Sequence, residues 1–312
     1  MASILVTGGA GFIGSHVVDA YIKAGHTVSV ADNLASGSLS NLNKKAKLYH
    51  IDVTSAKLEQ VFKKEAPVFV NHLAAQISVK ASMVDPVKDA RINVLGSLNL
   101  LEMCHKFGTK KLLFSSTGGA LYGEPQYLPC DEAHPINPLS AYGVAKRAVE
   151  LYIQALAPLY GLRYTILRYA NVYGPRQDPY GEAGVVAIFT ERMLRGAALT
   201  INGTGNQSRD FVFVADVVKA NLLALQRGDG CVYNIGVGAS TSVNEMYRKL
   251  RRLIKYRRSP MYSPAVPGEV FNIMLDSREA ARDLGWRPLT GIDEGLEKTV
   301  QYFQAEGRKQ RG

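Results

Sequence analysis

The first 170 residues alternate between short apolar runs and longer segments whose apolar residues recur every three or four positions. Short apolar runs are typical of buried strands, and the longer spacing is typical of helices. The predicted strands are Ser3–Thr7, Thr27–Ala31, Lys47–Ile51, Val68–Leu73, Lys111–Ser115 and Tyr164–Arg168. The predicted helices are Gly11–Ala24, Ser55–Lys64, Val87–Phe107 and Ala141–Leu156. This alternation predicts an α/β fold, a doubly wound parallel sheet with helices on both faces.

Small and polar residues follow three of the predicted strands, at Leu73 to Gln76, Ser115 to Thr117 and Tyr169 to Asn171. Ligands of such sheets bind at the carboxyl ends of the strands. We therefore expect these three segments to converge on one cleft. After about residue 170 the pattern becomes less regular and rich in Gly, Pro and Asn, which predicts a second, smaller mixed α/β domain.

The composition fits an ordinary globular enzyme. Of the 312 residues, 46% are hydrophobic, and no apolar run reaches the ~18 residues of a membrane span. A predicted strand begins almost at once, so we expect no export signal. Its three cysteines, Cys104, Cys130 and Cys231, are odd in number and widely spaced, which predicts reduced thiols of a cytoplasmic protein and no metal site.

The net charge is +10, and a dense group of Lys and Arg lies within residues 248–258. Such a group could bind nucleic acid. No nucleic-acid motif accompanies it, so we interpret it as a solvated helix face with mild attraction for anionic small molecules. We predict neither a nucleic-acid partner nor a membrane partner.

A glycine-rich turn joins the first predicted strand to the first predicted helix, with glycines at positions 8, 11 and 14. The absent side chains allow a tight turn and let the backbone approach a pyrophosphate, which the N–H groups of the helix bind. Asp32 lies about twenty residues further on, where a carboxylate accepts the adenosine ribose hydroxyls. The pattern predicts a dinucleotide site, with NAD favoured over NADP because Asp32 repels a 2′-phosphate. A structural turn with a capping Asp is the alternative.

Tyr142 and Lys146 lie four residues apart in a predicted helix, so their side chains share one face. A free phenol ionises near about pH 10 and is a poor base at neutral pH. A nearby ammonium or cationic cofactor ring favours the phenolate, which can take a proton from a sugar or alcohol hydroxyl. The pair alone also fits an ordinary amphipathic helix, and the dinucleotide turn is what makes it a catalytic candidate.

Eight segments together resemble a known family. They are Val6 to Gly14, Asp32 to Leu34, His72 to Ala75, Asn93 to Gly96, Ser115 to Gly123, Tyr142 to Lys146, Arg168 to Arg176 and Ser208 to Val212. In this order they resemble the extended short-chain dehydrogenases/reductases of the nucleotide-sugar type, and most closely the UDP-glucose (UDP-galactose) 4-epimerases. The resemblance implies a Rossmann-type NAD-binding domain over residues 1–170, a nucleotide-sugar-binding domain over residues 171–312, between which the chain can cross, and redox-neutral inversion at C4 of a UDP-sugar.

The resemblance also assigns residue roles. Tyr142 is the base, Lys146 bonds the nicotinamide ribose and lowers the pKa of Tyr142, and Thr117 bonds the reacting sugar oxygen, with Ser116 as the neighbouring alternative. The cofactor-binding residues are Gly8, Gly11, Phe12, Ile13, Gly14, Asp32, Asn33, Asp52, Val53, Leu73, Ala74, Ala75, Asn93, Ser115, Tyr142, Lys146 and Tyr169. The substrate-binding residues are Ser116, Thr117, Asn171, Gly184, Val185, Asn202, Arg209, Phe211 and Glu269. A surface ion pair with Asp210 is the alternative for Arg209, and strand-end capping is the alternative for Thr117.

Two segments depart from the family pattern. Residues 265–267 read Ala-Val-Pro where relatives usually carry a second diphosphate-binding Arg, so Arg176 or Arg278 would have to supply that charge. The segment Ser115 to Gly123 is one residue longer than the common form, and two glycines follow Thr117. Related dehydratases carry Asp-Glu there and decarboxylases a nearby Glu. Epimerisation needs neither, which favours a 4-epimerase.

Other functions fit the same sequence. A 4-epimerase of UDP-glucuronate or of a UDP-N-acetylhexosamine is one, because Ile273 stands where some relatives have a bulky Tyr and a smaller side chain would admit a 2-N-acetyl group. A non-catalytic NAD-sensing or RNA-binding protein on the same fold is the alternative from another class. Intact Thr117, Tyr142 and Lys146 argue against it.

The predicted helices Val87–Phe107 and Ala141–Leu156 carry more apolar residues than one core-facing stripe requires. The surplus includes Leu98, Leu101, Leu151, Tyr152 and Leu156. In relatives the corresponding helices of two subunits form a four-helix bundle, so the resemblance implies a homodimer. Packing within one subunit is the alternative.

Overall fold

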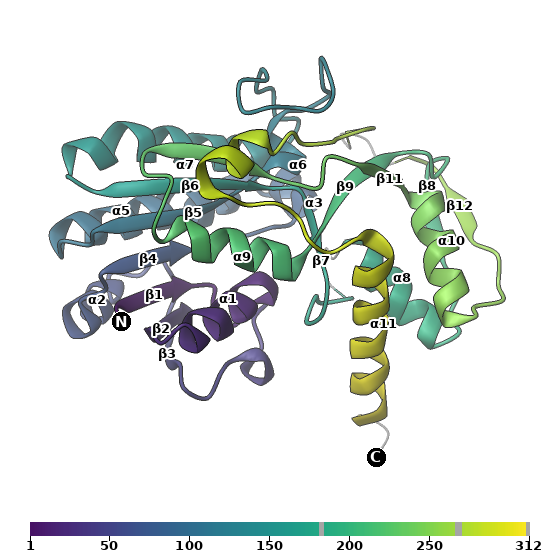
Figure 1. Cartoon of the computed structure of the whole chain (residues 1–312), viewed down its shortest axis with the longest axis horizontal. Helices are drawn as coiled ribbons and strands as arrows, with labels where there is room; N and C mark the ends of the chain where they lie inside the picture. The colour runs from purple at the N-terminus through teal and green to yellow at the C-terminus, as the bar shows by residue number, and fades with distance from the viewer. Residues whose placement is uncertain (181–183, 266–269, 310–312) are drawn as a thin grey trace.

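The computed structural model describes residues 1–180, 184–265 and 270–309. Its centre is a sheet of seven parallel strands in the order β10-β6-β5-β4-β1-β2-β3 (Figure 1). These strands are β1 (Ser3–Thr7), β2 (Thr27–Asp32), β3 (Lys47–His50), β4 (Phe69–His72), β5 (Lys111–Thr117), β6 (Arg163–Tyr169) and β10 (Cys231–Ile235). The predicted parallel sheet and its first six strands are confirmed. The seventh strand was missed because its five residues lie in the less regular half of the chain.

Helices cover both faces of this sheet. On one face lie α1 (Phe12–Lys23), α9 (Val214–Ala224) and the short π-helical turn η3 (Ala280–Leu284), and α1 and α9 run side by side (Figure 1). On the other face lie α2 (Leu58–Glu65), α5 (Gly96–Lys106) and α7 (Ala141–Leu159). The predicted helix over residues 87–107 is a continuous helical stretch made of α4 (Pro86–Ala90), the π-helical turn η2 (Arg91–Leu95) and α5. The doubly wound arrangement is therefore confirmed.

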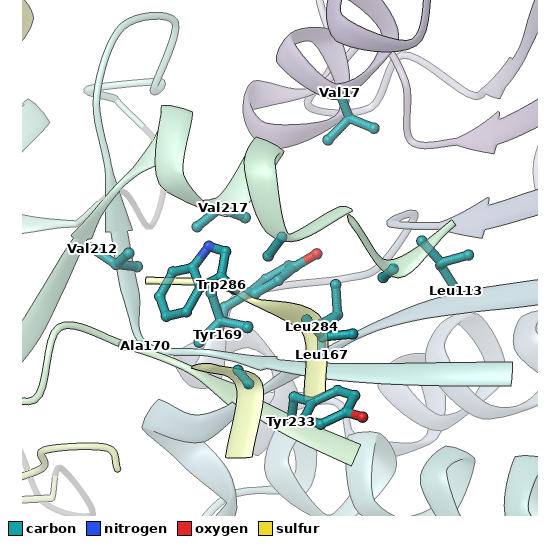
Figure 2. Packing of buried hydrophobic residues seen from close by; sticks show 14 of the residues in the cluster. Val17, Leu113, Leu167, Tyr169, Ala170, Val212, Val217, Tyr233, Leu284 and Trp286 are labelled. Carbon is teal, nitrogen blue, oxygen red and sulfur yellow. The ribbon is translucent and has the colours of Figure 1, made fainter. Parts of the chain in front are cut away.

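The alternation of strand side chains divides the core into two clusters. In β1, Ile4 and Val6 join the cluster beneath α1 and α9, whereas Leu5 joins the cluster beneath α2, α5 and α7. Figure 2 shows part of the first cluster, in which the indole of Trp286 is fully buried. Its Nε1–H donates to the Asp216 carbonyl oxygen at 2.8 Å, so the polar group of this large side chain is satisfied inside the core.

The second half of the chain adds a smaller mixed unit with its own apolar cluster. Its two small sheets have the orders β11-β9-β7 and β12-β8. The strands are β7 (Asn171–Tyr173), β8 (Thr200–Asn202), β9 (Ser208–Phe213), β11 (Ser240–Ser242) and β12 (Met261–Ser263), and the helices are α8 (Val185–Leu194), α10 (Val243–Ile254) and α11 (Ile292–Lys309). The remaining short helices are η1 (Leu39–Asn41), α3 (Val79–Val84) and α6 (Gly118–Leu121). The chain returns to the large sheet with α9 and β10, and the domain boundary at residue 170 stays a prediction.

Across the described part of the chain, no helix is both long enough and apolar enough to cross a bilayer. The basic group of residues 248–258 begins within α10 and continues past its end. Arg248, Arg251 and Arg252 are exposed, while the Lys249 ammonium pairs with the Asp293 carboxylate at 2.8 Å. This arrangement matches the solvated helix face predicted for these residues.

Candidate active site

A cleft of about 1570 Å³ opens at the carboxyl ends of the central strands. It includes the ends of β1 and β4, where the order of the strands reverses and ligands of such sheets bind. Its lining contains most of the predicted cofactor residues and both members of the Tyr-Lys pair. They are Gly8, Gly11, Phe12, Ile13, Gly14, Asp32, Asn33, Asp52, Val53, Leu73, Ala74, Ala75, Ser115, Tyr142, Lys146 and Tyr169. Ser116, predicted to bind the substrate, also lines the cleft. The structure thus brings together segments spread over the first 170 residues.

The glycine-rich turn forms a cradle that side chains would fill. Gly8 has a φ of +70°, and a Cβ there would lie 2.7 Å from the Ala74 nitrogen. A Cβ on Gly14 would lie 2.1 Å from the Gly8 carbonyl oxygen. Gly11 is the N-cap of α1 and supplies no side-chain acceptor, so it leaves the first-turn N–H groups of the helix to an anion. The residues present therefore fit the pyrophosphate of a dinucleotide.

Two carboxylates, those of Asp32 and Asp52, line the cleft together with the glycine-rich turn. Asp32 is buried and accepts hydrogen bonds from the backbone nitrogens of Ala10 at 2.9 Å and Leu34 at 2.8 Å. Asn33 donates from Nδ2 to the Asp52 carboxylate at 2.7 Å. Burial acts to raise the pKa of Asp52, but hydrogen bonds to its carboxylate outweigh burial and hold this pKa below its ordinary value. Both carboxylates line the part of the cleft where the sequence predicts the adenosine of the cofactor.

A buried histidine fixes the loop that follows β4. Nδ1 of His72 lies 2.7 Å from Thr7 Oγ1, and its Nε2 lies 2.8 Å from Ser97 Oγ. Burial lowers the pKa of His72 to about 3, so the ring is neutral at physiological pH. Thr7 Oγ1 in turn accepts a hydrogen bond from the Ala74 nitrogen at 3.3 Å. This chain of contacts holds Ala74 against the glycine cradle.

Asn93 lies behind the cleft and is absent from its described lining. It exchanges two hydrogen bonds with the Gln76 backbone, each of 2.9 Å, and donates a third to the Asp89 carboxylate. Gln76 Nε2 donates to the same Asp89 oxygen at 2.8 Å. The structure therefore shows Asn93 supporting the cofactor loop from behind, together with a buried Asp89 that the sequence analysis did not single out.

The Tyr-Lys pair lies at the start of α7, where the backbone is capped twice. Ser140 Oγ accepts from the Gly143 nitrogen and Ser82 Oγ accepts from the Tyr142 nitrogen, both at 3.1 Å. The Lys146 ammonium donates to the Ser115 carbonyl oxygen at 2.8 Å and lies 6.0 Å from the centre of the Tyr142 ring. The predicted proximity of the two side chains is therefore present.

The protein chain alone does not lower the pKa of Tyr142, as a nearby ammonium was expected to do. Burial first, and the charge of Asp89 second, raise the pKa of Tyr142 above its ordinary value. Burial also lowers the pKa of Lys146 to about 8, against the favourable charges of Asp89 and Glu150. In the protein chain alone, desolvation of the phenol outweighs the ammonium, and the phenol is protonated.

The three hydroxyls at the end of β5 have different surroundings. Ser115 Oγ lies 3.1 Å from the Tyr169 hydroxyl, and Ser116 Oγ donates to the buried Glu150 carboxylate at 2.6 Å. Thr117 Oγ1 has no hydrogen-bond partner within the described ranges. A Cβ added to Gly119 would lie 3.9 Å from Thr117 Oγ1 and 3.3 Å from Asn171 Oδ1, so Thr117 and Asn171 border a common space that a side chain at residue 119 would enter.

The predicted substrate residues beyond β6 lie outside the described lining of the cleft. Asn171 begins β7, and its buried Oδ1 has no partner among the described residues. Gly184 is the N-cap of α8 and Val185 is its first residue. Asn202 ends β8 and accepts from Ser263 Oγ at 2.9 Å.

Arg209 and Phe211 lie on β9. Arg209 donates to the Phe271 carbonyl oxygen at 3.1 Å. Asp210 is fully buried and accepts hydrogen bonds from three backbone nitrogens. Its carboxylate is therefore bound inside the fold, and the alternative of a surface ion pair with Arg209 does not apply. Phe211 is buried with its ring edge-on to Tyr173 at 6.3 Å. Glu269 lies outside the described residues.

Three further expectations concern residues near the substrate. Arg176 lines the cleft and pairs with Asp19 at 2.8 Å, whereas Arg278 has an 88% exposed side chain that pairs with Asp276. Of the two, Arg176 is therefore the one within reach of a cleft ligand. Ile273 is buried in the hydrophobic core, which explains its apolar character without a contact to a sugar.

Comparison with known proteins places the chain among nucleotide-sugar enzymes. Residues 4–236 match the model of the NAD dependent epimerase/dehydratase family. The chain belongs to this family. It is 52% identical to the UDP-glucose 4-epimerase of Thermotoga maritima solved with UDP-glucose, over 97% of this chain and 99% of that one, with a TM-score of 0.96. It is 42% identical to the Thermus thermophilus UDP-glucose 4-epimerase solved with NAD, over 97% and 99% of the chains, with a TM-score of 0.92. The UDP-glucose 4-epimerase of Mycolicibacterium smegmatis is 41% identical over 96% of this chain and 98% of its own.

The structure of this NAD-dependent family member also shows site residues that the sequence analysis missed. The cleft extends beyond the cofactor cradle along α8 and α11, where Tyr180, Arg195, Tyr302 and Arg308 line it. Nothing in the local sequence connects α11 with the first βα unit, because their proximity depends on the packing of the whole chain. Glu150 did carry a signal, since it lies four residues after Lys146 on the same helix face.

Proposed function

We propose that this protein is a UDP-glucose 4-epimerase that uses NAD. The observation that carries the proposal is the placement of Tyr142 and Lys146 in the same cleft as the glycine cradle and Asp32. A proton-transfer residue beside a dinucleotide site is what reversible oxidation of a sugar hydroxyl requires. The identities of 52% and 42% to solved UDP-glucose 4-epimerases over nearly the whole chain support it.

Tyr142 and Lys146 have different roles in the proposed reaction. When bound, NAD supplies the acceptor and donor of the hydride at C4 and, in its oxidised form, a positively charged ring. Tyr142 takes the proton of the 4-hydroxyl group and later returns it. That role needs the phenolate, and Lys146 together with the positive ring opposes the burial that raises the pKa of Tyr142.

Substrate recognition is divided between the reacting sugar and its nucleotide. Thr117 holds the 4-oxygen, and Asn171 presents beside it an amide oxygen that has no partner in the described part of the chain. Arg209 and Phe211 on β9 and Gly184 and Val185 at the start of α8 are our candidates for the diphosphate and nucleoside, with Asn202 on the same side. Anchoring through the nucleotide leaves the oxidised sugar free to turn, so that hydride returns to its opposite face.

The direct test is incubation of the purified protein with UDP-galactose, followed by chromatographic separation of UDP-glucose. We expect interconversion in both directions without net change in free NADH. Absence of conversion of UDP-galactose, and of its N-acetyl and uronic analogues, would refute the proposal.

UDP-glucuronate and UDP-N-acetylhexosamines are the alternative substrates. The argument from Ile273 no longer favours them, because that side chain is part of the core. Competition assays that give the ratio of kcat/KM values decide between the substrates, and we expect the ratio to favour UDP-glucose and UDP-galactose.

We also propose a homodimer through α4, η2 and α7, which pack together. Val87, Leu95, Val144, Leu151 and Tyr152 are each 44% to 68% exposed on these elements. Such an apolar surface is typical of an interface, and a two-fold contact is its commonest form. Two of the apolar residues expected at the interface do not lie on this surface: Leu101 is buried in the core, and Leu156 packs against the core. Light scattering should give twice the 34.0 kDa chain mass; a monomer with full activity would contradict the dimer.

We place the protein in the cytoplasm. Cys104 and Cys130 are buried free thiols, and Cys231 is partly buried. Burial raises the pKa of the Cys104 and Cys130 thiols to about 12, which makes both poor nucleophiles. Alkylation of a fresh denatured extract should modify all three cysteines, whereas an oxidised pair would contradict a reducing location.

A further inference from the structure

A buried carboxylate connects the strand that ends in Thr117 with the helix that carries Tyr142. Glu150 on α7 is fully buried. It accepts four hydrogen bonds: one from Ser116 Oγ at 2.6 Å, one from Arg147 Nη1 at 3.0 Å, and two from the Arg168 guanidinium at 2.9 and 2.7 Å. Arg168 lies on β6 and its side chain is 3% exposed. The carboxylate thus connects α7, β5 and β6 at one point.

The geometry around Glu150 gives the direction of the Ser116 hydrogen bond. The carboxylate forms ion pairs with the guanidinium groups of Arg147 and Arg168. The Ser116 hydroxyl donates its hydrogen bond to Glu150 Oε1. Ser116 then has lone pairs but no proton to offer a sugar oxygen. Ser115 is already within bonding distance of the Tyr169 hydroxyl, and Thr117 is the hydroxyl without a partner among the described residues.

We propose that Glu150 is a positioning residue of the reaction: it engages the Ser116 hydroxyl, fixes the end of β5 against α7, and leaves Thr117 to bond the reacting sugar oxygen. The proposal rests on the proposed function, because it assigns the hydroxyl that the epimerisation uses. It also resolves the choice between Ser116 and Thr117 that the sequence left open.

Ser116→Ala is the informative variant. It removes one hydrogen bond from Glu150 while the Arg168 Nε–H still bonds the same carboxylate oxygen, so no buried group loses its last partner. We expect kcat to fall about tenfold, since small displacements of a reacting group are costly, with unchanged KM for UDP-galactose and unchanged NAD content. Thr117→Ala should lower kcat about a hundredfold or more, as removal of a direct transition-state hydrogen bond does.

Glu150→Ala removes both carboxylate oxygens, leaves the Arg168 guanidinium without its counter-charge in the interior and destabilises the fold. This variant is therefore compared with the double variant. Addition of Ser116→Ala to Glu150→Ala should lower neither kcat nor Tm further, because Ser116 has already lost its acceptor. Ser259→Ala and Glu102→Ala change exposed residues of the same types and should retain the activity of the wild-type protein.

Two results would overturn the proposal. Equal losses of kcat in Ser116→Ala and Thr117→Ala would mean that Ser116 itself bonds the sugar, and an unchanged kcat in Ser116→Ala would mean that no positioning occurs. Failure of the proposed function is distinguishable, because the wild-type protein would then not epimerise any UDP-sugar. In that case the double-mutant cycle on Tm, measured without substrate, still tests the connection, and additive effects would refute it.

Discussion

At the scale of single residues, the phenol of Tyr142 is the group that transfers the proton in the proposed reaction. Tyr142→Phe removes the hydroxyl and keeps the ring, so the wall of the cleft is retained. General acid–base groups contribute about a hundredfold to ten-thousandfold, and we expect kcat to fall about a thousandfold. Bound NAD, measured after denaturation, should remain at the wild-type level. A variant that keeps its turnover would contradict the role of Tyr142 as the base.

Asp32 carries the prediction for cofactor choice. Asp32→Asn removes the negative charge and keeps an oxygen that can accept from Leu34 or Ala10. A hydrogen bond to a charged group contributes about 1.5–3 kcal/mol, so the Kd for NAD should rise about tenfold to a hundredfold. Discrimination against NADP should weaken, since the repulsion of its 2′-phosphate is lost. Titration of the two cofactors against the stripped protein measures both effects, and an unchanged NAD/NADP ratio would refute the assignment.

At the scale of elements, the packing of α4 against α7 makes the activity depend on pH through Asp89. The charged and titratable groups acting on the pair are Asp89 on α4, Glu150 on α7 and His72 on β4. The charge of Asp89 raises the pKa of Tyr142 and of Lys146. Asp89→Asn therefore lowers both values, and the rise of kcat with pH should move about one unit toward acid.

The control for that experiment is Asp85→Asn, on the same helix. Asp85 is exposed and caps α4 by accepting from the Lys88 nitrogen, a role that Asn also fills. Its pH profile should match that of the wild-type protein. A shift of the Asp89→Asn profile toward alkali, or equal shifts in both variants, would contradict the electrostatic role of Asp89.

Elements with local signals were predictable, and elements that depend on distant partners were not. The glycine turn and α1 follow from spacing within one βα unit. β10 joins the sheet only because its strand pairs with β6, from Cys231 against Thr165 to Ile235 against Tyr169. A five-residue strand carries too little periodicity to be recognised without that partner.

At the scale of the whole molecule, the same distinction separates the two halves of the site. The cofactor half is built from consecutive βα units, so nearly all of its predicted residues line one cleft. The supporting network of His72, Asp89 and Glu150 consists of buried side chains whose partners come from other elements. The spacing of Glu150 from Lys146 placed it on the same helix face, but the sequence around His72, Asp89 and Glu150 gives no sign of their partners on other elements. The burial that raises the pKa of Tyr142 in the protein chain alone also depends on elements distant in sequence.

In the proposed reaction, hydride leaves C4 of the sugar and returns to C4 within one cleft. The most direct test is UDP-galactose carrying deuterium at C4, with the UDP-glucose product analysed by mass spectrometry and NMR. We expect the product to keep the label at C4 and none to appear in water, because the hydride stays in the cleft between its two transfers. Loss of the label to solvent, or its appearance at another carbon, would refute this reaction.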